Sequence, residues 1–92
     1  MKAFKVTIGI TEKQGFTTEG LKTAILNDLA EINLSLISFA YDNGTCECII
    51  EYKNFGLMLP YHQIVLGGIH GLAMKYPYID IDGIDPEFIE IS

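Results

Sequence analysis

The sequence predicts an α+β fold with the element order strand, helix, strand, strand, helix, strand, written βαββαβ. An Asn-Gly turn near the middle marks a hairpin, the first ten residues alternate between apolar and polar, and the segment between them repeats apolar residues at helical spacing. The 92 residues, 49% of them hydrophobic, supply enough apolar material for one core. We therefore expect a single α+β domain spanning residues 1–92.

The hairpin turns at Asn43-Gly44, because this pair supplies the two positive-φ residues of a two-residue type I′ turn. Its strands are expected at about 34–42 and 45–53. Counting outward from the turn predicts the cross-strand register. The predicted pairs are Asp42 with Thr45, Tyr41 with Cys46, Phe39 with Cys48 and Ile37 with Ile50.

This register divides the hairpin side chains between two faces of the sheet. The face predicted to lie under the helices holds Ile37, Phe39, Tyr41, Cys46, Cys48, Ile50 and Tyr52. The face predicted to be open holds Leu36, Ser38, Ala40, Glu47, Ile49 and Glu51. Because Leu36, Ser38, Ala40 and Ile49 leave the open face lightly charged and half apolar, it is a candidate homodimer face. A plain solvated surface is the alternative.

The other elements are predicted from the spacing of apolar residues and from residues that begin or end helices and strands. Residues 2–10 alternate as a strand with its apolar side chains on one face, and Thr17 or Thr18 can cap a helix. The apolar stripe of that helix is predicted to hold Leu21, Ile25, Leu29 and Ile32, with Lys22, Asn27, Asp28 and Glu31 away from it. A second helix is expected from Pro60 to about Tyr76.

The glycines between Pro60 and Tyr76 leave an alternative open, a strand at 63–66 followed by a Gly loop. The last 15 residues predict a strand at 78–82, a turn at Gly83 and Asp85-Pro86, and a short strand at 88–91. The whole order is the ferredoxin-like pattern: a four-stranded antiparallel sheet in spatial order 4-1-3-2 (4132), with two helices on one face. This fold hosts many functions and implies none.

Charge is concentrated at the C-terminal end. The net charge is −6, and residues 76–92 contain five acids and no base. These acids are Asp80, Asp82, Asp85, Glu87 and Glu90. An acidic segment of this kind predicts a small non-enzymatic protein-interaction module, of inhibitor, immunity or regulatory type, that binds a basic protein surface. The acidic balance and the absence of arginine argue against direct binding of nucleic acid or an anionic membrane.

A small-molecule-binding or ligand-sensing domain is the alternative function, and an enzyme comes third. The alternative site is the glycine-rich segment Gly67–Gly71, with His62 or His70 lining a pocket. The site would hold Gly67, Gly68, His70 and Gly71 in addition to His62. A helix face made small for close packing is the competing interpretation of the same glycines.

No cofactor, metal or catalytic residue is predicted. Cys46 and Cys48 share a strand face and are expected to be buried free thiols, which favours a reducing, cytoplasmic location. The acidic run after Asp80 does not match a calcium loop. Phosphate hydrolysis of the acylphosphatase type needs an arginine, and iron–sulfur binding needs four cysteines per cluster; the chain has no arginine and two cysteines. No membrane span or secretion signal is expected.

Overall fold

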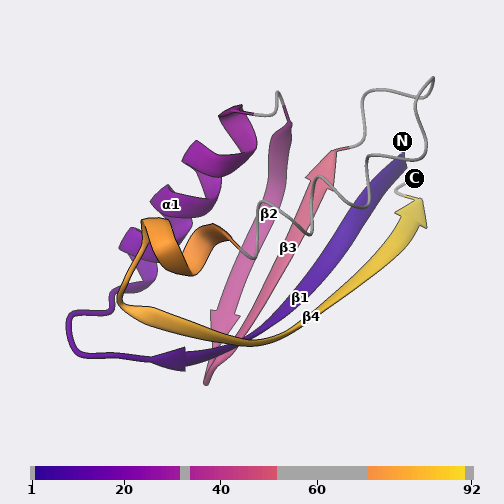
Figure 1. The fold of residues 1–92 in the computed structure, drawn as a ribbon. Helices are drawn as coiled ribbons and strands as arrows, with labels where there is room; N and C mark the ends of the chain where they lie inside the picture. The colour runs from indigo at the N-terminus through magenta and orange to yellow at the C-terminus, as the bar shows by residue number, and fades with distance from the viewer. Residues whose placement is uncertain (1, 32–33, 52–70, 91–92) are drawn as a thin grey trace.

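The computed structural model describes residues 2–31, 34–51 and 71–90. Its described elements are β1 (Lys2–Glu12), α1 (Thr18–Glu31), β2 (Ser35–Asp42), β3 (Thr45–Glu51) and β4 (Ile79–Glu90). The strands form one antiparallel sheet in the order β2-β3-β1-β4, which is the expected 4-1-3-2 counted from the opposite edge (Figure 1). The long strands β1 and β4 curve strongly along their length, as Figure 1 shows.

The hairpin turn forms as the Asn-Gly pair predicts. Asn43 and Gly44 both have positive φ, at 46° and 82°, and Asp42 pairs with Thr45 across the turn. The pairs of Tyr41 with Cys46 and of Phe39 with Cys48 are confirmed as well. Two positive φ angles in succession match the right-handed twist of the flanking strands, so the turn fixes the register close to it.

The register prediction is wrong beyond Ser38. A β-bulge between Leu36 and Ser38 leaves Ile37 unpaired, and Leu36 rather than Ile37 lies opposite Ile50. Because one extra residue reverses the side-chain alternation, Leu36 packs against the core and Ile37 is 40% exposed. The bulge therefore exchanges these two residues between the predicted faces. The predicted contribution of Tyr52 lies outside the described residues.

The C-terminal segment is one strand, where the sequence indicated a strand, a turn and a second strand. β4 runs from Ile79 to Glu90 and pairs with β1 along its length, with a register shift at Gly9 and Ile10. Pro86 is accommodated because β4 is an edge strand, where a residue without a backbone N–H is tolerated. β1 is also longer than predicted and ends at Glu12.

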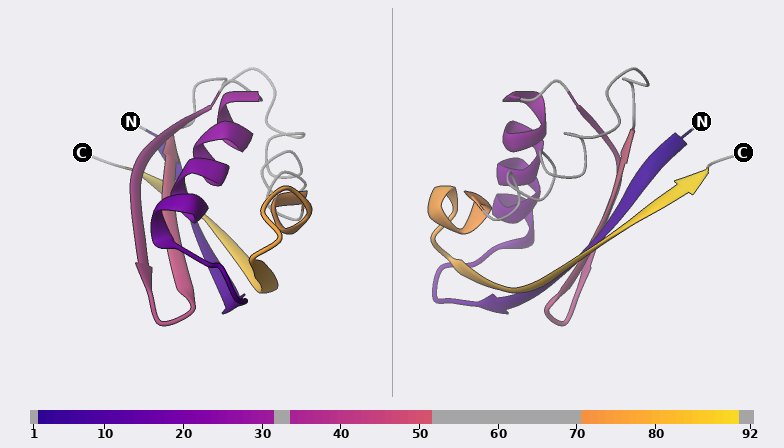
Figure 2. Two further views of the ribbon diagram at one scale, coloured as in Figure 1. Left: turned by 90° about the vertical axis from the view of Figure 1, so that its left-hand side faces the viewer. Right: turned by 45° about the vertical axis from the view of Figure 1, so that its right-hand side comes forward.

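The described helical residues lie on one face of the sheet, and no described element covers the other face (Figure 2). The predicted helical stripe is confirmed for Leu21, Ile25 and Leu29, which are buried against the sheet. The sheet contributes the apolar face of β1 and the buried residues of β3, namely Phe4, Val6, Ile8, Ile10, Cys46, Cys48 and Ile50. At about 25 cal/mol per Å² of apolar area removed from water, burial of these side chains is the main term that stabilises the fold.

Of the predicted second helix, the structure describes the end. Residues 71–75 are helical, and Leu72 and Tyr76 are buried in the same core as α1. The earlier part of that helix, and the alternative strand at 63–66, lie outside the described residues. Within the described ranges, no helix is long and apolar enough to cross a membrane.

Candidate functional site

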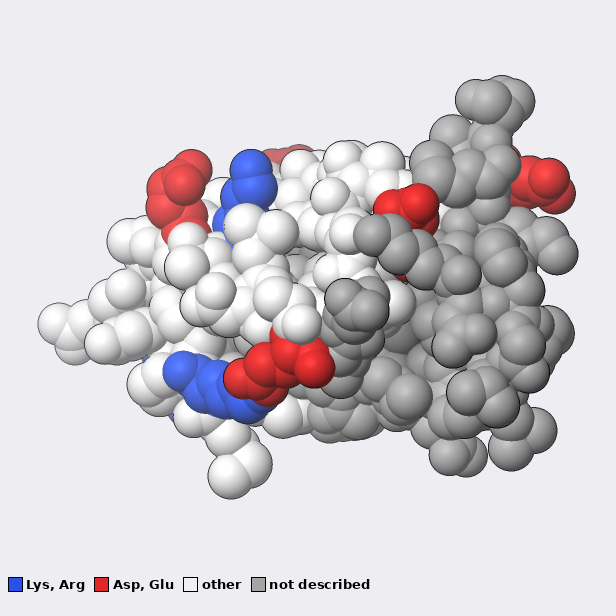
Figure 3. Space-filling view, turned by 90° about the horizontal axis from the view of Figure 1, so that it is seen from above, with Lys and Arg blue, Asp and Glu red and all other residues white. Residues whose placement is uncertain are grey.

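The acidic residues of β4 do not form the free acidic row that the sequence indicated. Asp80 forms an ion pair with Lys13 at 3.1 Å, and Asp82 accepts a hydrogen bond from the Thr11 hydroxyl at 2.6 Å. Cross-strand pairing places Glu87 opposite Lys5 and Glu90 opposite Lys2, with Asp85 opposite Thr7. The lysines of β1 therefore lie beside much of the β4 charge. Figure 3 shows acidic side chains at several places on the visible face, with one acidic group in contact with a basic side chain.

The predicted dimer face loses one of its four residues. Leu36 is turned to the core side by the bulge, while Ser38 and Ala40 are exposed on edge strand β2 and Ile49 is half-buried on β3. An ion pair of 3.6 Å joins Lys5 and Glu47 on the same face. Ile37 takes the place of Leu36 on this face, and dimerisation through the face remains a prediction.

Four residues of the alternative ligand site lie outside the described residues: His62, Gly67, Gly68 and His70. Gly71 is described and lies in the helical stretch 71–75. A Cβ added to Gly71 would meet no atom of the described residues within 4 Å, so close packing against them does not explain the glycine at this position.

The two cysteines occupy the core as predicted. Cys46 and Cys48 are free and buried on one face of β3, with their sulfur atoms 3.7 Å apart. The hydrogen bond with Cys46 and burial both raise the pKa of the Cys48 thiol above its ordinary value. Across the described ranges, no three His, Cys, Asp or Glu side chains are grouped so that they could hold a metal ion.

The loop between β1 and α1 is held by its own backbone and by aromatic side chains. The N–H of Lys13 donates to the carbonyl of Tyr78, and the N–H of Phe16 donates to the carbonyl of Lys13. Gly15 has a φ of 96°, and a Cβ there would approach the Tyr78 ring to 2.8 Å. A side chain at residue 15 would be strained and would clash, which accounts for glycine in this tight loop.

Tyr76 connects this loop to the helical residues 71–75. Its hydroxyl accepts a hydrogen bond from the N–H of Thr17 and donates one to the Thr17 carbonyl, both at 3.1 Å. The Thr17 hydroxyl in turn accepts from the N–H of Gly20 at 3.0 Å and caps α1. The N–H groups of Thr17 and Gly20 are therefore already occupied by protein oxygens. This arrangement differs from a phosphate cradle, which needs free N–H groups at the start of a helix.

A second hydroxyl network holds the hairpin turn to the end of β1. The Tyr41 hydroxyl donates to the Glu12 carboxylate and accepts from the N–H of Gly44. Partial burial, followed by the hydrogen bond to Glu12, raises the pKa of Tyr41 to about 12. Tyr41 also packs against Phe16, with ring centroids 5.1 Å apart. The hydroxyl is committed to these structural contacts.

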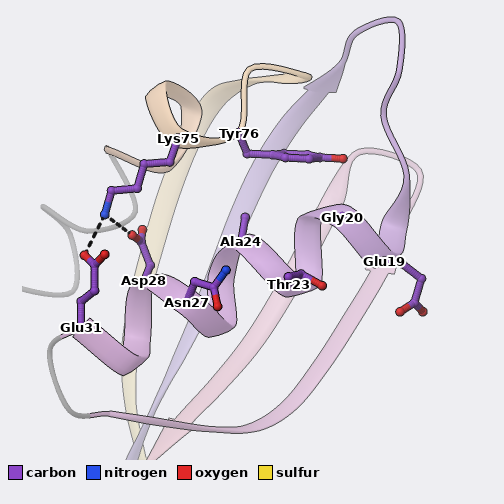
Figure 4. Close-up of a pocket in the computed structure, with 9 residues that line it drawn as sticks. All are labelled: Glu19, Gly20, Thr23, Ala24, Asn27, Asp28, Glu31, Lys75 and Tyr76. Atoms are coloured by element: carbon purple, nitrogen blue, oxygen red, sulfur yellow. Dashed lines mark hydrogen bonds and ion pairs between the residues drawn. The ribbon is translucent and has the colours of Figure 1, made fainter.

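A groove along α1, here called the α1 groove, is the described cavity whose lining combines acidic, basic, polar and aromatic side chains. It has a volume of about 540 Å³ and lies between the outer side of α1 and residues 75–76 (Figure 4). Its described lining comprises Glu19, Gly20, Thr23, Ala24, Asn27, Asp28, Glu31, Lys75 and Tyr76. Residues three, four, seven and eight apart on a helix share one side, so α1 presents these side chains as a continuous strip.

The small residues Gly20 and Ala24 let the opposite wall come close to α1. A Cβ added to Gly20 would lie 2.7 Å from the Tyr76 hydroxyl and 2.8 Å from the Thr17 hydroxyl. Glycine at this position is therefore required for the contact of Tyr76 with the first turn of α1. Figure 4 shows the Tyr76 ring extending over this part of the helix, while Lys75 reaches the other end of the groove.

An ammonium group occupies the far end of the α1 groove. The Lys75 Nζ lies 2.5 Å from Asp28 Oδ1 and 3.0 Å from Glu31 Oε2. The Asp28 side chain is 10% exposed, whereas the Lys75 side chain is 53% exposed. The hydrogen bonds to Asp28 and then Glu31 raise the pKa of Lys75, so the amine stays protonated. The end of the groove is thus a carboxylate pair already organised around a cation.

Sequence reasoning placed Asn27, Asp28 and Glu31 away from the apolar stripe but did not identify a site there. The available signal was a strip of small and polar residues on α1 that flanks the apolar stripe, with its members three or four residues apart. Polar residues on the outer side of a helix are ordinary in soluble domains, so the strip alone does not distinguish a groove from plain surface. The position of Lys75 depends on tertiary packing.

Comparison with known proteins shows the fold. No protein-family model matches the chain, and no curated protein matches it in sequence. Among solved structures, it resembles the crystal structure of acylphosphatase from Bacillus subtilis. The TM-score is 0.64 at 12% identity, over 100% of this chain and 89% of that one. At this identity the likeness supports the ferredoxin-type α+β architecture alone.

The comparison also corrects the functional interpretation of the sequence. The expected non-enzymatic interaction module, binding a basic protein surface through β4, is wrong: the solved structure that the chain resembles is that of an enzyme, and this match gives no support to an inhibitor. The physical reason lies in β1, whose lysines face β4 carboxylates. A count of acids along the chain does not include the lysines that the neighbouring strand places opposite them.

Proposed function

We propose that this chain is a ligand-binding domain whose α1 groove takes a small organic molecule with a positively charged amine group. The observation that carries the proposal is the Lys75 ammonium bound by Asp28 and Glu31 at the end of the groove. Two carboxylates that hold one ammonium have the geometry to hold another, with charge-assisted hydrogen bonds supplying orientation. The proposal differs from the corrected one in its site, on α1, and in its ligand, a small molecule.

The dimensions of the groove support a ligand of metabolite size. Its volume of about 540 Å³ lies within the usual range for small-molecule sites, roughly 300–1,000 Å³. Ala24 and the Tyr76 ring offer apolar surface, while Thr23 and Asn27 offer hydrogen-bonding groups between the charged end and the first turn of α1. A molecule with an amine at one end and an apolar body fits this distribution.

A series of probes that differ in charge tests the proposal. Phenethylamine, the neutral phenethyl alcohol and the anionic 3-phenylpropionate have similar size and one aromatic ring each. Titrated into the protein at neutral pH and low salt, the amine is expected to bind at least about tenfold more tightly than the alcohol, since a charge-assisted hydrogen bond contributes roughly 1.5–3 kcal/mol. The carboxylate is expected not to bind. Equal affinity for the three probes would contradict the proposal.

Acyl phosphate hydrolysis is the second candidate, because the structural neighbour is an acylphosphatase. Two features of the chain weigh against it. It has no arginine, and Lys13 in the β1–α1 loop is paired with Asp80. The acids of the α1 groove would repel a phosphate. An assay with benzoyl phosphate separates the candidates: hydrolysis in proportion to protein concentration would favour the enzyme.

A cytoplasmic location and the absence of a nucleic-acid partner complete the proposal. The free thiols of Cys46 and Cys48 support a reducing compartment. The net charge of −6 without arginine disfavours contact with a polyanion.

A further inference from the structure

Lys75 and Asp28 differ in how much of each side chain is exposed to water. The Asp28 side chain is nine-tenths buried, whereas the Lys75 side chain is about half exposed and Glu31 is 67% exposed. A nearly buried carboxylate needs a cation or strong hydrogen bonds to offset its lost hydration. Lysine can regain its own hydration by a rotation of its long stem. Asp28 therefore depends on the ion pair more strongly than Lys75 does.

Any ligand that brings its own ammonium satisfies the same requirement. Lys75 is the one basic side chain in the described lining of the groove, which also holds three carboxylates. A second ammonium beside Asp28 would meet Lys75 at the same oxygen atoms, and two cations in one subsite repel each other. Ligand and Lys75 must then compete for Asp28 and Glu31.

We propose that Lys75 is a tethered occupant of the ammonium subsite, which holds Asp28 and Glu31 in the empty groove and is displaced when an amine ligand binds. This inference rests on the proposed function and adds how that site is regulated. Because Lys75 belongs to the chain, its local concentration is fixed, and it lowers the apparent affinity for every amine ligand alike. Amines that bind weakly then do not occupy the groove at ordinary concentrations, whereas a ligand with further contacts along α1 still does.

A purely structural role for the same ion pairs makes the opposite prediction. If Lys75 serves to tie residues 71–76 to α1, its removal loosens one wall of the groove and weakens ligand binding. If Lys75 is a competitor, its removal strengthens binding of an amine. The sign of the change in affinity distinguishes the two roles.

Phenethylamine affinity in wild type, Lys75→Met and Lys75→Arg provides the first test. Lys75→Met keeps a long apolar stem, and we expect its affinity to rise about threefold to fivefold, the range that corresponds to release of a partly exposed ion pair. Lys75→Arg keeps the competing cation and should show no increase. An unchanged or lower affinity in Lys75→Met, while wild type binds the amine, would overturn the inference.

A measurement on the unmodified protein guards against a variant that fails to fold. We expect the hydrogen bonds to Asp28 and Glu31 to slow the exchange of the Lys75 ammonium protons with water, so their NMR signal should be visible in the empty protein at low temperature. Saturation with phenethylamine is expected to broaden that signal beyond detection, and a signal that persists at saturation would contradict displacement. If wild type binds no amine at all, the proposed function fails first. Failure of displacement alone leaves that function standing.

Discussion

Two groups of acidic residues in this molecule lie in contrasting settings, one on the edge strand β4 and one in the α1 groove. On β4 the acids are spread along a curved edge strand, beside residues of β1 such as Lys5 and Thr11 and beside Lys13 of the β1–α1 loop. In the α1 groove, Asp28 and Glu31 converge on one ammonium, and Asp28 is nearly buried. The groove holds fewer acids, yet it holds them in a geometry that can select a ligand. Carboxylates that converge on one point and are partly buried select a ligand better than a larger number of carboxylates spread over the surface.

The largest expected effect is on amine affinity, which should depend on the acids of the α1 groove and hardly at all on those of β4. Asp28→Asn removes the buried negative charge and keeps the shape, so we expect phenethylamine affinity to fall at least about tenfold. The triple variant Asp85→Asn, Glu87→Gln, Glu90→Gln removes more charge and should change the affinity less than about twofold, because long-range attraction is screened by salt. A titration of both variants at 0.15 M salt makes the comparison. A larger loss in the β4 variant would reverse the assignment of the site.

The next effect concerns stability, through the hydroxyl of Tyr76. Tyr76→Phe removes two hydrogen bonds to the backbone of Thr17 and leaves the N–H of that residue unpaired. We expect the free energy of unfolding to fall by about 1–3 kcal/mol, measured by urea denaturation. On the β4 side, Asp82→Asn retains a side-chain acceptor for the Thr11 hydroxyl and should cost less than about 1 kcal/mol. Equal losses would mean that the Tyr76 contact does not anchor the groove wall.

Alkaline pH is expected to have a smaller effect on stability, through the Tyr41 hydroxyl, which donates a hydrogen bond to the Glu12 carboxylate. The pKa of Tyr41 is raised to about 12 in the folded protein, so the folded state keeps the proton longer than the unfolded chain. The contribution is fully present below pH 10 and is lost as pH rises toward 12. We expect a fall in melting temperature over this window that Tyr41→Phe reduces. A fall of the same size in Tyr41→Phe would assign the alkaline sensitivity to other groups.

The smallest effect is expected where an ion pair is fully on the surface. Lys13→Met breaks the contact with Asp80, in which both side chains are about half exposed. Such pairs contribute between about 0 and 1 kcal/mol, so the melting temperature should change little, and amine binding should not change. A loss of amine binding in this variant would show that β4 and the groove are not independent.

The sequence predicts local structure well where one residue type determines the backbone. Asn43-Gly44 fixed the hairpin turn and the nearest pairs, because few residues accept two positive φ angles. The four-residue spacing of Leu21, Ile25 and Leu29 likewise predicted the buried side of α1. The bulge at Ile37 was not predictable, since no residue type there demands it.

The candidate site was less accessible to sequence reasoning than the fold. Asp28 lies 47 residues from Lys75, and no local pattern indicates that they meet. The β4 acids lie close together in the sequence, between residues 80 and 90, whereas the β1 lysines that face two of them are 82 and 88 residues away. Glu87 opposite Lys5 is one such pair. Sheet pairing and helix packing, rather than composition, decide which charges remain available.

The most direct test of the central claim maps the amine on the molecule by amide chemical shifts. During a phenethylamine titration of the labelled protein, we predict that the largest shifts occur at Thr23, Asn27, Asp28 and Lys75, which line the α1 groove. The amides of β4, residues 79–90, are predicted to stay nearly constant. Largest shifts along β4, or no saturable shift in the α1 groove, would contradict the assignment of this groove as the ligand site.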